Sequence, residues 1–166
     1  MPYVQEPMPV VCTPPMRQWP MLQLPYGGGI TEIKHLNMRG LQELYCDDNP
    51  LTTLPWDELW NLYFLGIYYC AFVRLDLWQA PNLGYVYAGD NYDLATVDAH
   101  GNTSLYNLDL YYCPSLVDLD ITGCTNLRYI YAYGCAFDEA MVDQLLADIV
   151  TNGVTNGYLR INGGSS

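Results

Sequence analysis

The chain has 166 residues, 51% of them hydrophobic, which is enough for one domain with a sizeable core. It carries 18 acidic residues against 6 basic ones, a net charge of −12, so we expect neither nucleic acid nor an anionic membrane surface as a partner. No apolar run approaches the roughly 18 residues that a membrane span needs.

The first segment, residues 1–27, holds seven of the eleven prolines. Proline removes backbone donors and favours extended chain, so we predict a Pro-rich extended arm that does not fold alone. Such an arm would either cover the end of the domain that follows or dock on another subunit. It lacks a basic stretch followed by an apolar one, so we expect no secretory signal.

Residues 28–135 repeat a pattern of eleven residues. The blocks TSLYNLDLYYC, PSLVDLDITGC and TNLRYIYAYGC follow one another from Thr103 to Cys135, with apolar residues at positions 3, 6 and 8 and cysteine at position 11. Blocks of ten or eleven residues continue this pattern upstream to a weaker first member at 28–38. The alternation around positions 6 and 8 is typical of a short strand with one buried face. A single block cannot bury its apolar face, so stacked blocks are predicted.

Two successive blocks together span 21 or 22 residues. Leu41–Leu51 and Leu62–Phe72 both follow the pattern L-x-x-L-x-L-x-x-N/C-x-L, with Cys46 and Ile67 at the third leucine position and Phe72 at the last. In these residues the chain resembles the leucine-rich-repeat family. It is most similar to the short class of that family, in which both halves of a coil have similar sequences. The resemblance implies a mainly β solenoid over 28–135, with two ladders of short parallel strands. It does not imply one function, because this fold serves many.

Position 11 of the blocks holds asparagine, cysteine or a small or apolar residue. An asparagine there can bond unpaired backbone groups at the corners of adjacent coils, and a thiol is a small, weak donor that can occupy the same place. We therefore interpret most cysteines as reduced core residues. A disulfide between coils is an alternative. A metal site is another, which the lack of C-x-x-C or a histidine at zinc-like spacing disfavours. We predict no metal and no cofactor. The cysteines interpreted as core residues are Cys46, Cys70, Cys113, Cys124 and Cys135.

Alternate blocks present their outward residues on two different faces. On one of them, formed by blocks 39–49, 60–70, 81–91, 103–113 and 125–135, positions 5, 7 and 9 are mostly aromatic. Tyrosine suits a half-exposed strand, which is one explanation. A contiguous aromatic patch is also typical of a recognition surface. On this second interpretation the partner-binding residues are Tyr45, Phe64, Tyr68, Tyr85, Tyr87, Tyr111, Tyr129, Tyr131 and Tyr133.

The other face is polar and acidic, and Asp76, Asp98 and Asp120 recur along it at one position. Stacked like charges are unfavourable unless solvent or a cation relieves them. We interpret this face as a solvated acidic surface, with calcium bridging as the alternative.

The eleven-residue pattern ends at Cys135, and residues 136–166 form a predicted C-terminal cap. Apolar residues at helical spacing after an Asp138 N-cap predict a helix at about 138–151. A short strand at about 157–162 follows. This ending is similar to that of leucine-rich-repeat proteins from bacteriophages and environmental bacteria.

No converging set of reactive groups is recognisable, so we predict that the chain is not an enzyme. We expect a structural or binding protein of a bacteriophage virion, in the tail, a fibre or the capsid surface. It would act through the aromatic face and residues 1–27 within a larger assembly, with protein as partner and glycan as a further ligand class. The alternative is an extracellular or cell-surface bacterial adhesin that binds protein or glycan, and a third is an intracellular scaffold.

Overall fold

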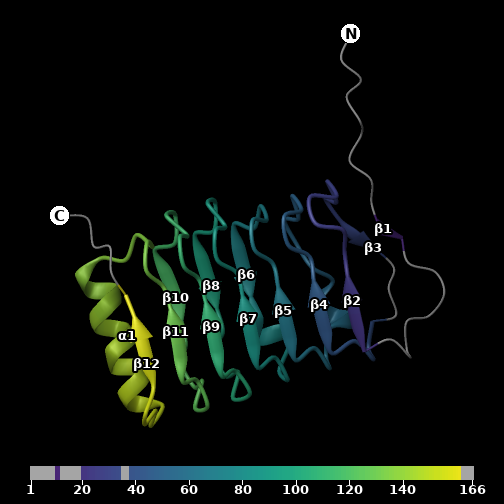
Figure 1. The fold of residues 1–166 in the computed structure, drawn as a ribbon. Helices are drawn as coiled ribbons and strands as arrows, with labels where there is room; N and C mark the ends of the chain where they lie inside the picture. The colour runs from purple at the N-terminus through teal and green to yellow at the C-terminus, as the bar shows by residue number, and fades with distance from the viewer. Residues whose placement is uncertain (1–9, 12–19, 35–37, 162–166) are drawn as a thin grey trace.

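The computed structural model describes residues 10–11, 20–34 and 38–161. Successive coils of the chain stack into a solenoid, and Figure 1 shows their strands side by side from β2 to β12. One wall is a parallel seven-stranded sheet in the order β12-β11-β9-β7-β5-β4-β2. Its strands are β2 (Met21–Gln23), β4 (Glu43–Tyr45), β5 (Phe64–Gly66), β7 (Tyr85–Tyr87), β9 (Asn107–Asp109), β11 (Tyr129–Tyr131) and β12 (Tyr158–Arg160).

The opposite wall is a parallel three-stranded sheet of β6 (Arg74–Asp76), β8 (Thr96–Asp98) and β10 (Asp118–Asp120). These two sheets are the two predicted ladders, so the solenoid fold class is confirmed. Near the N-terminal end, β1 (Val10–Val11) pairs with β3 (Ile33–Lys34).

The second wall is shorter than the repeat predicts, because block 50–59 forms no strand. Its residues carry instead the 3-10 turn η1 (Trp56–Glu58), and a second such turn, η2 (Leu77–Gln79), follows β6. Pro55 has no amide hydrogen to donate to a neighbouring strand, which is unfavourable within a ladder. Both turns lie in the ten-residue blocks, so the missing residue is absorbed by a tighter corner.

The first wall is longer at its N-terminal end than the sequence suggests. Residues 1–27 were expected to be an extended arm, but Met21–Gln23 form β2 and pair in register with β4, and Leu22 is buried. Alternating Met21, Leu22 and Gln23 fit a strand with one buried face, so the boundary at residue 27 is wrong. The arm prediction for residues 1–9 and 12–19 lies outside the described residues.

The leucine positions of the repeat form one continuous core. Leu41, Leu62, Leu83 and Leu105 at position 3 are fully buried, as is the central residue of every strand from β4 to β9 within about 1%. Each coil therefore buries its apolar face against its neighbours, as the repeat predicts.

Corner asparagines and cysteines link the coils. Asn91 Nδ2 donates to the carbonyls of Ile67 (2.8 Å) and Ala88 (2.9 Å), and its Oδ1 accepts from the amide of Cys70 (3.1 Å). Cys113 Sγ occupies the corresponding place one coil later and donates to the carbonyl of Ala88 (3.4 Å). The structure thus agrees with the interpretation that cysteine replaces asparagine at position 11.

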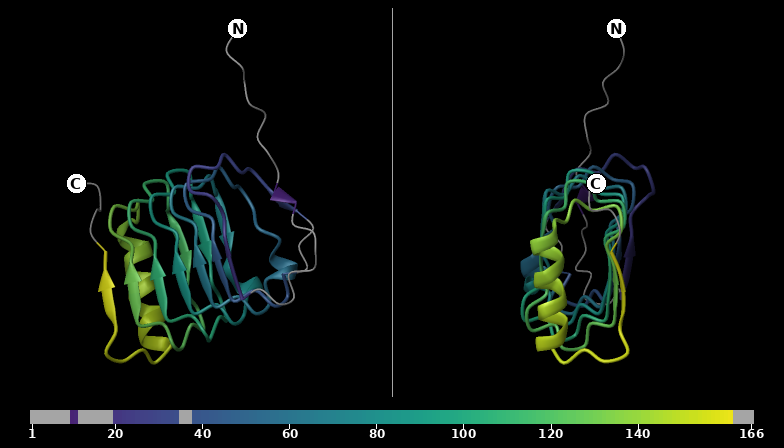
Figure 2. Two further views of the ribbon diagram at one scale, coloured as in Figure 1. Left: turned by 45° about the vertical axis from the view of Figure 1, so that its right-hand side comes forward. Right: turned by 90° about the vertical axis from the view of Figure 1, so that its left-hand side faces the viewer.

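The cap ends both walls at once. Helix α1 (Glu139–Thr151) begins at Asp138, whose Oδ1 accepts from the amide of Met141 (2.8 Å), and it lies beside β10, while β12 pairs with β11 (Figure 2). Leu145, a residue of α1, is fully buried. Asn152, at the end of α1, continues the corner ladder, because its Nδ2 donates to Ile121 and its Oδ1 accepts from Gly123, both at 2.8 Å. In the part of the chain described, no helix has the length and apolar character of a membrane span.

Candidate functional site

The nine aromatic residues predicted to bind a partner all lie on the outer side of the seven-stranded wall. Six are strand residues and three (Tyr68, Tyr111 and Tyr133) stand two positions after a strand. All nine are half-buried. We call this surface, together with the loop residues that follow its strands, the aromatic face.

Ring contacts on the aromatic face form two rows across the strands. One row passes from Tyr63 through Tyr85 and Tyr106 to Tyr129, with ring centroids 5.2–5.7 Å apart. The second row joins neighbouring rings with centroids 4.7–6.1 Å apart. Its members are Tyr45, Phe64, Tyr87, Tyr68, Tyr111, Tyr112 and Tyr133. Sequence analysis missed Tyr63 and Tyr106, which stand at position 4, just before the strand, and are exposed.

Glycines in the wall make room for these rings. A Cβ at Gly89 would lie 2.7 Å from the Tyr111 ring and 2.8 Å from the Tyr68 ring, and one at Gly84 would lie 2.8 Å from Tyr63. The rings therefore lean across the sheet onto bare backbone. This packing gives the aromatic face a structural role in addition to any role in binding.

Carboxylates lie among the rings and accept from their hydroxyls. Tyr68 donates its hydroxyl to Asp109 Oδ2 (3.0 Å), and Tyr45 donates to Glu43 Oε2 (3.0 Å). Burial raises the pKa of Asp109, although the Tyr111 amide and the Tyr68 hydroxyl partly offset this. Burial likewise raises the pKa of Tyr68, and the nearby Asp109 adds to the shift.

The loop that follows each strand of the aromatic face contains a residue in the left-handed backbone region. Asp48, Tyr69, Asp90 and Tyr112, at position 10 of four successive coils on this side, have φ angles of 52–57°. The equivalent corners of the other wall, Gly101 and Gly123, and of the last coil, Gly134, are glycines. Tyr69 and Tyr112 are 45% and 48% exposed. The alternation of aspartate and tyrosine at position 10 is visible in the sequence, but nothing in the repeat pattern singles it out.

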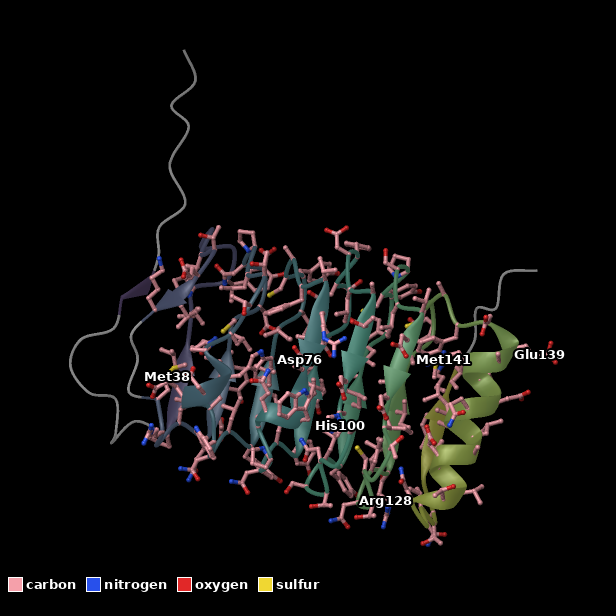
Figure 3. The ribbon with its side chains drawn as sticks, turned by 180° about the vertical axis from the view of Figure 1, so that it is seen from behind. Met38, Asp76, His100, Arg128, Glu139 and Met141 are labelled. Carbon is pink, nitrogen blue, oxygen red and sulfur yellow. The ribbon has the colours of Figure 1, made fainter. Side chains whose placement is uncertain are left out.

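On the acidic face of the opposite wall, Arg74 forms ion pairs with two of the aspartates. Its Nε lies 2.6 Å from Asp76 Oδ1 and its Nη2 lies 3.2 Å from Asp98 Oδ2, so an arginine separates two of the stacked carboxylates. Asp98 Oδ1 also meets His100 Nδ1 at 2.6 Å, and the labelled Asp76 and His100 can be followed in Figure 3. Burial alone would raise the pKa of Asp98, but bonds from His100 outweigh it and lower that pKa.

The aspartates proposed for calcium bridging are therefore not a simple column. Asp98, His100 and Asp120 have potential ligand atoms within 4.8 Å of one another, whereas Asp76 pairs with Arg74. Because Asp98 already contacts the guanidinium of Arg74 and the imidazole of His100, these groups reduce the repulsion between the stacked carboxylates without a bound cation. Calcium binding on this face stays an untested alternative.

The described cysteines are free thiols, and four of the five are buried. Burial raises the pKa of Cys113 and of Cys124 to about 12, and that of Cys135 to about 11. A thiol with such a pKa is protonated at neutral pH and is a poor nucleophile. These residues therefore fit a packing role better than a chemical one. Cys12 lies outside the described residues.

No protein-family model matches the chain, and no curated protein matches its sequence. Among solved structures, the chain is similar to the functional domain of InlJ from Listeria monocytogenes, which includes a cysteine ladder, with a TM-score of 0.55 and 22% sequence identity. The match covers 74% of this chain and 32% of that one, so it spans about a third of the chain in that structure. At this identity the likeness concerns the fold alone. The coils, ladders and cap described above, together with this likeness, show that the chain has a leucine-rich-repeat-like solenoid fold.

Proposed function

We propose that this protein is a non-enzymatic binding protein that holds a protein partner against its aromatic face. The observation that carries the proposal is the backbone at Tyr69 and Tyr112. A left-handed conformation disfavours an L residue by roughly 1–2 kcal/mol, and a bulky one is a marked outlier. Glycine fills the same corner on the opposite wall. Two exposed tyrosines thus occupy corners where the fold alone favours glycine, and strained backbone of this kind is typical of functional surfaces.

The rest of the aromatic face supports the same proposal. Tyrosine combines a large, stiff contact area with a polar tip, and rings of this kind are enriched at recognition hot spots. The rings are also held in place before any partner arrives, because they pack on one another and bond to Asp109 and Glu43. Such preorganisation lowers the entropy lost on binding.

We further propose a place for the protein on a bacteriophage particle, with the N-terminal residues docked on a neighbouring subunit. This rests on the phage-like C-terminal ending and on the proline density of residues 1–27. Because β2 belongs to the solenoid and β1 pairs with β3, a deletion that tests docking should remove residues 1–9 and leave Val10 onward intact. The shortened chain is expected to fold but to be absent from purified particles when they are examined by mass spectrometry. Normal incorporation of the shortened chain would contradict the docking role.

The binding role can be tested with a random peptide library displayed on an unrelated carrier. The library is panned on the wild-type protein and on a Tyr69→Gly/Tyr112→Gly variant, with Trp78→Leu as a matched control. Trp78 is an exposed aromatic residue on the opposite side, stacked on His100. We expect peptides that are retained by the wild type and the control and lost by the double variant. Circular dichroism of the double variant checks that it is folded.

Equal recovery of peptides on all three proteins would contradict a binding role for the aromatic face. Recovery of no peptide, together with binding on a glycan array that Tyr69→Gly/Tyr112→Gly abolishes, would assign the face to glycan instead.

A further inference from the structure

We infer that the partner of the aromatic face is a cationic polypeptide segment whose arginine side chains stack on the tyrosine rings beside the carboxylates of this face. The inference rests on the proposed function and names the chemistry of its partner.

The first support is the distribution of charge on the aromatic face. On β4, β5, β7 and β9 and in the loops that follow these four strands, the described charged residues are all acidic: Glu43, Asp47, Asp48, Asp90 and Asp109. The described cations at the C-terminal end of this wall are Arg128, directly before β11, and Arg160, the last residue of β12. With a net charge of −12 on the chain, this face attracts a positive ligand over most of its length.

The second support is a contact that the protein makes with its own side chain. The guanidinium carbon of Arg160 stands 4.6 Å from the centroid of the Tyr133 ring, within the range of a cation–π contact. One ring of the aromatic face therefore already accepts a guanidinium. Three other rings of the same row have carboxylates beside them instead: Tyr45 has Glu43, Tyr68 has Asp109 and Tyr111 has Asp90.

The third support is the way the carboxylates are held. Asp47 Oδ1 accepts from the amide of Tyr68 (2.8 Å), and among the described residues no hydrogen bond uses its Oδ2. Glu43 Oε2 accepts from the Tyr45 hydroxyl, and Asp109 accepts from the Tyr68 hydroxyl with Oδ2 and from the Tyr111 amide with Oδ1. The carboxylates are thus fixed beside the rings, and this combination suits a guanidinium, which is planar, weakly hydrated and rich in donors.

The tilt of the rings favours separate cations over a sugar chain. Tyr68 is inclined by 51° to Tyr87 and by 55° to Tyr111, whereas Phe64 and Tyr87 lie within 28° of parallel and Tyr111 and Tyr133 within 11°. The row therefore changes direction at Tyr68 and does not form one flat platform on which a long sugar chain could stack. Each ring can instead hold one side chain of an extended peptide.

The experiment uses fluorescently labelled peptides in which serine alternates with arginine, lysine or glutamate, and measures binding by anisotropy at low and high salt. We expect the arginine peptide to bind more tightly than the lysine peptide, the glutamate peptide not to bind, and the affinity to fall with salt. Tyr87→Leu/Tyr131→Leu, which keeps apolar bulk but removes two rings, should weaken the arginine peptide about tenfold.

A pair of charge variants separates this site from a general attraction. Glu43→Gln/Asp47→Asn removes two negative charges from the aromatic face and keeps an acceptor oxygen for each internal bond, so it should weaken binding about fivefold. Asp118→Asn/Asp120→Asn removes the same charge from the opposite wall and should change the affinity less than about twofold. Equal effects of the two pairs would overturn the inference, because net charge alone would then explain binding.

Failure of this inference can be told apart from failure of the proposed function. If the panned library yields peptides that depend on Tyr69 and Tyr112 but lack basic residues, and the arginine peptide does not bind, the partner is not cationic although the face still binds. If neither the library nor the arginine peptide depends on the aromatic face, both proposals are wrong.

Discussion

Replacing Asn91 tests how the corner ladder stabilises the solenoid. In the Asn91→Ala variant, the amide of Cys70 and the carbonyl of Ile67 lose a buried partner, and the carbonyl of Ala88 loses one of its donors. Each buried polar group left unpaired destabilises a protein by about 1–3 kcal/mol, so for these two groups we expect the free energy of unfolding to fall by about 2–6 kcal/mol.

Asn91→Cys should fall between the wild type and Asn91→Ala. A thiol at this corner can donate to the preceding coil, as Cys135 Sγ does to the carbonyl of Leu110 at 3.2 Å, but it would leave the amide of Cys70 without an acceptor. We expect it to lose about half as much stability as Asn91→Ala, or about 1–3 kcal/mol.

Urea unfolding followed by circular dichroism measures both variants, with Asn82→Ala as the control. Asn82 also donates to a carbonyl of the preceding coil (Trp60, 2.8 Å), but it is exposed, so its loss should be near 0.5 kcal/mol. The reasoning is refuted if Asn91→Ala is as stable as Asn82→Ala, or if Asn91→Cys is no more stable than Asn91→Ala.

Three other changes probe the packing, the acidic face and the cap. Gly89→Ala should lower the free energy of unfolding by about 1–3 kcal/mol because its Cβ would collide with two tyrosine rings; Gly66→Ala, whose nearest neighbour would be 3.3 Å away, should have a smaller effect, and equal melting temperatures would contradict this. The hydrogen bond to Asp98 raises the pKa of His100, so its contribution to stability is present at low pH and is lost as the pH rises through the folded-state pKa. An NMR titration should show a lower His100 pKa in Asp98→Asn, and an unchanged value would show that the pair does not form in solution. Asn152→Ala removes the bonds that join the end of α1 to Ile121 and Gly123, so it should increase the rate of amide hydrogen exchange in α1 more than in the central coils. An equal increase in α1 and the central coils would mean that the cap is not a separate unit.

The sequence pattern predicts most of the fold because each repeat has the same residue types at the positions that are buried or hydrogen-bonded to the next coil. Leucines at positions 3 and 6 must be buried, Asn91 and Cys113 need partners on the preceding coil, and the change to helical spacing after Cys135 marks the cap. The structure confirms these features.

Departures from the prediction arise where local chemistry overrides the period. Proline density predicts an extended arm up to residue 27. However, β2 pairs with the edge of β4, and Leu22 is therefore buried in the core. The apolar positions of block 50–59 match the repeat, so they do not reveal the effect of Pro55. A strand at this position would lack one amide donor. Both outcomes depend on contacts between coils, which a period does not describe.

The candidate site is predictable in position but not in geometry. The repeat placed Tyr87 and its equivalents on one face, which the structure confirms. It could not show that Tyr69 and Tyr112 hold a left-handed backbone, or that Asn107, expected to point outward, is buried with no partner for its Nδ2 among the described residues. Those features depend on the backbone geometry of the corners and on contacts between coils, which a repeat pattern does not describe.

The most direct test of the account is an NMR titration of the isotopically labelled protein with the tightest peptide recovered from the library. We predict that the amide shifts change on β4, β5, β7 and β9 and in the loops after them, including Tyr69 and Tyr112, while β6, β8 and β10 are unaffected. Changes confined to β6, β8 and β10 would contradict the claim that the aromatic face is the contact surface.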